Sequence, residues 1–144
     1  MLFALAGAFV SGTMIALQAP TKGLLARGAG SPVNAALISF AVGTIALLVV
    51  ALLLGARPAP GAMRAMPWHA WAGGLYGAVF VGLAAFAAPR IGVTFFLAIS
   101  IAGQLAMALL LDRIGAFGID RVALSPTRLA GVALVLVGVV LVRR

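Results

Sequence analysis

Five long apolar runs alternate with short polar gaps along the chain. Each run contains few or no charged residues, and the gaps are rich in proline, glycine and arginine. A helix needs roughly 20 apolar residues to cross about 30 Å of hydrocarbon, and the runs lack the alternation of barrel strands. We therefore predict an all-α integral membrane protein, a single membrane domain (1–144) with five transmembrane helices, at residues 2–19, 33–54, 68–88, 91–111 and 127–142.

Prolines define the two clearest gaps between these runs. The gap at residues 55–67 contains three of them, so we expect a non-helical surface loop there, with Pro58, Pro60 and Pro67. Only Pro89 and Arg90 separate the third run from the fourth. Trp68 and Trp71 open the third run, where aromatic side chains typically anchor a helix at the membrane interface.

The composition supports a membrane protein and argues against other classes. Of the residues 65% are hydrophobic and 8% are charged, and the mean hydropathy is +1.25. A net charge of +8 would suggest nucleic-acid binding in a soluble protein, but here the basic residues fall in the gaps between runs, so we predict no nucleic-acid partner. Cysteine is absent, and we predict no metal and no cofactor. Nine arginines to one lysine, with abundant alanine, indicate a GC-rich bacterial genome and hence the bacterial cytoplasmic (inner) membrane.

The basic residues divide equally between the two sides of a five-span chain. The side of the N-terminus has five: Arg57, Arg64, Arg113, Arg121 and Arg128. The other side also has five: Lys22, Arg27, Arg90, Arg143 and Arg144. The positive-inside rule has almost nothing to act on, so either the protein inserts in both orientations or a partner homologue fixes one.

Small residues recur every four positions in several runs. Such ladders let helix backbones approach closely in lipid. We predict helix packing along two of them, Ala4, Ala8 and Gly12 in the first span and Gly74, Ala78 and Gly82 in the third.

The sequence resembles the YdcZ family of the drug/metabolite transporter superfamily over nearly its whole length. The residues that carry the resemblance are Gln18, Ser31, Pro32, Ala36 to Ser39, Phe40, Gly43, Trp68 to Gly74, Gly77, Gly103, Gln104, Leu111, Asp112, Gly115, Arg128, Gly131 and Gly138. The resemblance implies half of a ten-helix transporter that works as an antiparallel pair, formed by one dual-topology protein, by two homologues or by a fusion. Many relatives have Asn where this chain has Lys22.

Polar residues inside the predicted spans are the candidates for function. In the first span Ser11, Gln18 and Lys22 fall on one helical face, and Pro20 removes a backbone hydrogen bond at that level. They form a candidate polar wall of a substrate cavity. The alternative is that Gln18 and Lys22 lie at the interface, with the lysine snorkelling towards water.

The other spans add fewer candidates. Ser39 and Tyr76 are cavity candidates in the second and third spans, although Tyr76 also suits the interfacial belt. In the fourth span Ser100 and Gln104 lie one turn apart, and a glutamine near mid-bilayer needs a partner from another helix or another subunit. Asn34 is interpreted as a helix cap.

Asp112 ends the fourth span and is one of only two acidic residues. We expect it to pair with Arg113 or Arg121 at the surface; the alternative is a gating or proton-coupling carboxylate. No acidic residue lies inside a predicted span, which disfavours proton-coupled export of cations. His69 is the only histidine and has no evident catalytic partner, so we predict no enzyme and no catalytic residue.

The sequence therefore predicts a transporter subunit that exports or exchanges a small neutral or amphipathic solute. It would work by alternating access, as a dual-topology antiparallel homodimer in the lipid bilayer. Two alternatives stay open: a dual-topology passive channel lined by polar side chains, and a membrane assembly protein that transports nothing. The substrate, the coupling ion and the direction of transport do not follow from the sequence.

Overall fold

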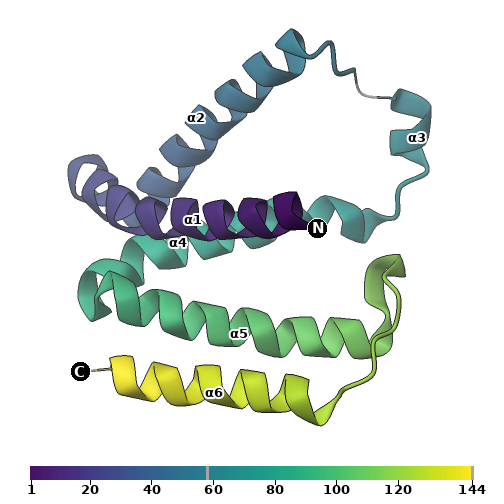
Figure 1. The fold of residues 1–144 in the computed structure, drawn as a ribbon. Coiled ribbons are helices and arrows are strands. Elements are labelled where there is room, and N and C mark those ends of the chain that lie inside the picture. Colours follow the sequence, from purple (N-terminus) through teal and green to yellow (C-terminus); the bar gives the residue numbers. More distant parts are fainter. Residues whose placement is uncertain (58, 144) are drawn as a thin grey trace. The chain divides into compact units, whose positions relative to one another are not determined.

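The computed structural model describes residues 1–57 and 59–143 as helices joined by turns (Figure 1). Five helices are long: α1 (Leu2–Ala29), α2 (Pro32–Leu53), α4 (Gly73–Ile91), α5 (Val93–Ile114) and α6 (Pro126–Val142). Three are short: α3 (Pro60–Arg64), the 3-10 helix η1 (Trp68–Ala72) and the 3-10 helix η2 (Ala116–Gly118). The described residues contain no strand, and the predicted all-α class is confirmed.

Four helical segments are long and apolar enough to cross a membrane. They are Leu2–Gly28, Pro32–Leu53, Trp68–Ile91 and Val93–Ile114, and at most 17% of the apolar window in any of them is buried inside the chain. Lipid is the solvent that such outward-facing apolar surface requires. The fifth helix, α6, is apolar but has 17 residues, about 26 Å at 1.5 Å per residue. Its crossing of the membrane stays a prediction.

The chain packs as two compact units, which meet along the sequence between Arg90 and Ile91. In the first unit α1 and α2 are joined at Gly30 and diverge from that turn (Figure 1). Ser31 caps α2, since its hydroxyl accepts from the backbone N–H of Asn34 at 3.0 Å. Asn34 is therefore not the cap; its side chain donates to the carbonyl of Ala29 at the end of α1.

Two helices continue through prolines that we expected to end them. α1 runs ten residues past Ala19, with Pro20 inside it, and α4 runs through Pro89 to Ile91. Each proline removes one donor, which leaves the rest of the helix intact. Side chains also bind carbonyls nearby: Thr21 donates to Leu17 at 2.8 Å, and Arg90 donates to Phe86.

Two further boundaries differ from those predicted. The break after the third span lies at Gly92, whose φ of 84° is a conformation that side chains disfavour. The gap at residues 55–67 is not wholly non-helical, since α3 forms one turn there with its proline at the first position, where no N–H is needed. Pro58 and Arg144 lie outside the described residues.

Small residues fill the interior of the first unit. Within the described part of the chain no large side chain is fully buried, and the buried apolar residues of this unit are Ala19, Ala35, Ala36, Val81, Ala84, Ala85 and Ala88. Gly23 of α1 lies so close to α4 that a Cβ there would be 2.8 Å from Cγ of Pro89. Gly77 of α4 faces the ring of Phe40 on α2.

These contacts do not use the two predicted ladders. A Cβ built on Gly12, Gly74 or Gly82 meets no atom within 4 Å. In α4 the buried residues are Val81, Ala84, Ala85 and Ala88, whose mean direction lies about 70° around the helix from that of the predicted ladder. The described residues of the first unit do not pack closely on Gly12, Gly74 or Gly82, and packing along the ladders stays a prediction.

In the second unit α5 and α6 lie side by side and run in opposite directions (Figure 1). The connecting segment folds back on the end of α5, where the backbone N–H of Val122 donates to the carbonyl of Asp112. Nε of Arg121 donates to the carbonyl of Ile114 at 3.2 Å. A cation in that position also complements the negative end of the helix dipole.

Candidate functional site

A cavity of about 250 Å³ opens in the first unit. Its lining comes from three helices: Gln18 and Lys22 of α1, Ser39, Phe40, Gly43, Thr44 and Leu47 of α2, and Val81 of α4. Small-molecule pockets usually measure roughly 300–1,000 Å³. The cavity of one chain therefore suits a small solute, or forms part of a larger site.

Lys22 is the most buried polar residue of the described chain, with 5% of its surface exposed. Its Nζ donates to Oε1 of Gln18 at 2.6 Å, a contact between residues one turn apart on the same face. Local helix geometry thus places Gln18 and Lys22 side by side on the face of α1 that borders the cavity.

Ser39 and Thr44 bring hydroxyl groups from the facing helix, and Phe40, Gly43 and Leu47 add an apolar stripe. Positions 40, 43, 44 and 47 share one face of α2, because residues three and four apart are neighbours on a helix. Of these lining residues our site prediction included only Ser39. Thr44 has a hydroxyl but was not among our candidates, and Phe40, Gly43 and Leu47 are apolar, so only the way α2 faces α1 reveals them.

The remaining candidates for the cavity lie elsewhere. Ser11 is exposed and donates to the carbonyl of Ala8, and Tyr76 is 64% exposed on α4. In the second unit Ser100 donates to the carbonyl of Phe96. Gln104 lies exposed at the middle of α5, and its amide makes no hydrogen bond with the described residues. Within the first unit, the structure thus brings together Gln18, Lys22 and Ser39.

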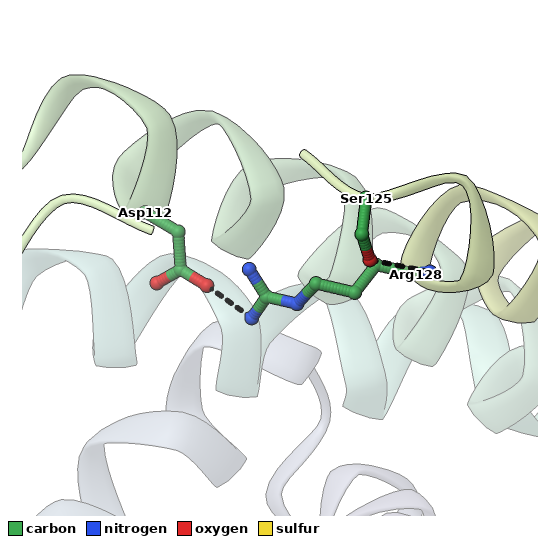
Figure 2. Close-up of polar contacts among 3 residues, drawn as sticks. All are labelled: Asp112, Ser125 and Arg128. Carbon is green, nitrogen blue, oxygen red and sulfur yellow. Dashed lines mark hydrogen bonds and ion pairs between the residues drawn. The ribbon is translucent and has the colours of Figure 1, made fainter. Parts of the chain in front are cut away.

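Asp112 pairs with Arg128, and not with Arg113 or Arg121 as we expected. Figure 2 shows the guanidinium of Arg128 reaching from the first turn of α6 to Oδ2 of Asp112 at 2.6 Å. Ser125 holds that turn in place, since its hydroxyl accepts from the backbone N–H of Arg128 at 3.3 Å. Arg113 is adjacent in sequence and leaves the helix about 100° away, while Arg121 binds Ile114.

The ion pair borders a second cavity of about 280 Å³ between α5 and α6. Apart from Asp112 and Arg128 its lining is apolar: Leu105, Ala108, Leu109, Gly131 and Val132. Within residues 1–57 and 59–143 no three acidic or histidine side chains gather in a way that could hold a metal ion. Neither cavity therefore presents a metal centre in the part of the chain that is described.

We expect Asp112→Asn to lower the free energy of unfolding by at most about 1 kcal/mol, because the side chains of Arg128 and Asp112 are 39% and 27% exposed and water screens the pair. Denaturant titration in micelles should show the same loss for Arg128→Gln and no further loss in the double variant. Asp120→Asn, an exposed acid in the loop, is the matched control. Loss of transport in Asp112→Asn alone would assign the carboxylate a gating or coupling role.

The family described as "Putative inner membrane exporter, YdcZ" matches residues 3–141. The chain belongs to the YdcZ family. The match spans both cavities and nearly all of the five long helices. Together with the four apolar helices it makes this YdcZ protein a multi-pass protein of the inner membrane. No curated protein and no solved structure matches the chain.

Proposed function

We propose that this chain is one protomer of an exporter that works as a dual-topology, antiparallel homodimer. Its two units form a single five-span membrane domain. Two such domains in opposite orientation enclose a site for a small amphipathic solute, which alternating access exposes to each side in turn. The family supports export as the activity, since its members are described as inner membrane exporters.

The equal division of basic residues carries the proposal. Arg57 and Arg64 lie between α2 and α4, and three more arginines lie between the last turn of α5 and the first turn of α6. On the opposite side, Arg27, Arg90, Arg143 and Arg144 lie near the ends of the helices, and Lys22 lies inside α1 in the half of the span nearer that side. A chain with an odd number of spans and balanced charge has no preferred orientation, so both orientations share the membrane.

An inverted second copy would also use what one copy leaves unused. Gln104 has an unbonded amide at the middle of a spanning helix, where a hydrogen-bond partner is valuable. The ladders at Ala4, Ala8 and Gly12 and at Gly74, Ala78 and Gly82 present small residues that the described residues of the first unit do not cover closely. The cavity of 250 Å³ would become one half of a site between subunits.

We expect a reporter fused after Arg144 to be active on both sides of the membrane. A reporter that works only in the cytoplasm and one that works only in the periplasm should both give signal in separate fusions of the wild-type chain. A variant with two extra lysines after Val142 is the control, because the added charge should silence the periplasmic reporter. A single location for the wild-type chain would contradict dual topology.

A further inference from the structure

Lys22 is a buried cation in a helix that crosses the membrane. A charge within a span is costly unless it is paired or reaches water. Lys22 lies seven residues before Ala29, about 10 Å from the nearer end of α1. A snorkelling lysine would extend towards that end. Here Nζ binds Gln18, one turn in the opposite direction, so the ammonium turns towards the middle of the span and into the cavity.

No carboxylate of the first unit can neutralise this ammonium. The chain has two acidic residues, Asp112 and Asp120, and both follow Arg90. Asp112 is already engaged by Arg128. An ammonium has three N–H donors, and Gln18 accepts from one of them. Within the first unit the cavity therefore has an excess positive charge and unused donors.

The rest of the lining combines hydroxyl groups with apolar side chains. Ser39 lies seven residues into α2, about 10 Å from the first residue of that helix, and so at the level of Lys22. Phe40 lies at nearly the same level, and Thr44 and Leu47 lie about 18 Å and 22 Å from the start of the helix. The cation therefore has a hydroxyl and an aromatic ring at its own level, and Leu47 and Val81 add further apolar surface.

We infer that Lys22 binds the anionic group of the exported solute and that the cavity selects small amphipathic monoanions. The carboxylate or sulfonate of such a solute would accept from Nζ of Lys22 and from the hydroxyl of Ser39, and its hydrocarbon part would lie against Phe40 and Leu47. The substrate class rests on the proposed export function. The phosphate of a lipid headgroup offers the same anionic chemistry, and we assign the site to the free organic anion.

The test measures binding to the full-length chain in nanodiscs of zwitterionic phosphatidylcholine. The probes are benzoate, hexanoate and benzenesulfonate, with the uncharged benzamide and hexanamide for comparison. We expect the anions to bind and the amides to bind about tenfold more weakly or worse, since a charged partner strengthens a hydrogen bond. Equal binding of acids and amides, or no binding of any anion, would overturn the assignment.

Substitutions test whether Lys22 is the cation that binds the anions. Lys22→Gln should weaken binding of the anions about tenfold or more, and Lys22→Arg should retain it. Arg27→Gln removes an exposed cation from the same helix, with the same effect on charge balance, and should bind as wild type does. If Lys22→Gln and Arg27→Gln bind the anions equally, Lys22 is not the anion site. Unfolding midpoints of all variants exclude a folding defect as the cause.

Two further measurements distinguish a free organic anion from a lipid headgroup, and separate the proposed substrate class from the proposed antiparallel exporter. Adding phosphatidylglycerol to the nanodiscs should leave benzoate binding unchanged; its displacement at low lipid fractions would assign the site to a lipid headgroup. If amides bind in a Gln18-dependent manner and the anions do not, the export function survives without this substrate class. If anion binding depends on Lys22 but the C-terminal reporters show one location, the site survives without the antiparallel dimer.

Discussion

Two variants with opposite charge bias are expected to form a mixed dimer with each other, whereas neither variant is expected to form a homodimer. Arg57→Gln with Arg64→Gln leaves three basic residues on the N-terminal side against five on the other. Arg27→Gln with Arg143→Gln leaves five against three. The positive-inside rule then fixes the two variants in opposite orientations. Because an antiparallel pair needs one protomer of each orientation, neither variant alone can form it.

The measurement is co-purification of two differently tagged chains from one membrane. Opposite variants should be recovered together several-fold above background, and two copies of the same variant should not. Arg27→Gln with Arg57→Gln is the matched control, since it removes two charges but keeps four on each side. Two differently tagged copies of this variant should still be recovered together. Equal recovery of same-bias and opposite-bias pairs would show that subunit orientation does not govern assembly.

Replacing Gly23 with alanine should destabilise the first unit by about 1–3 kcal/mol, the usual cost of overpacking. The new Cβ would lie 2.8 Å from Cγ of Pro89, and a proline ring cannot swing aside as a flexible side chain does. Gly7→Ala is the control in the same helix. It has no atom within 4 Å of the new Cβ, and alanine is by itself the better helix former.

The contact itself is tested by removing the other partner. Pro89→Ala should restore stability in the Gly23→Ala background, so that the two changes are not additive in denaturant titrations in micelles. If Gly23→Ala is as stable as Gly7→Ala, α1 and α4 do not approach each other at this point.

The spans could be predicted because hydropathy depends on local composition alone. Helix ends were harder, since the length of α1 beyond Pro20 and of α4 beyond Pro89 depends on how well the neighbouring turns survive the loss of one donor. The break at Gly92 depends on a backbone angle that composition does not determine.

The candidate cavity could be predicted in part. The proximity of Gln18 and Lys22 follows from helical spacing, and the structure shows their hydrogen bond. The contributions of Phe40 and Leu47 depend on the rotation of α2 after the turn at Gly30, which involves residues distant in sequence. The partner of Asp112 likewise depends on the register of α5 against α6, which the loop at residues 115–125 sets.

The interior of the first unit is made of small residues, and this bears on how the proposed pairing would respond to dilution of the protein in lipid. With no large side chain fully buried in the described residues, the apolar surface of a single chain faces lipid, and in the proposed pair a second copy would replace part of that lipid. Association therefore exchanges lipid for protein and gains little from water release. If the chains pair as we propose, the extent of pairing would depend on the number of protein copies per lipid molecule, and thus on expression level and membrane area.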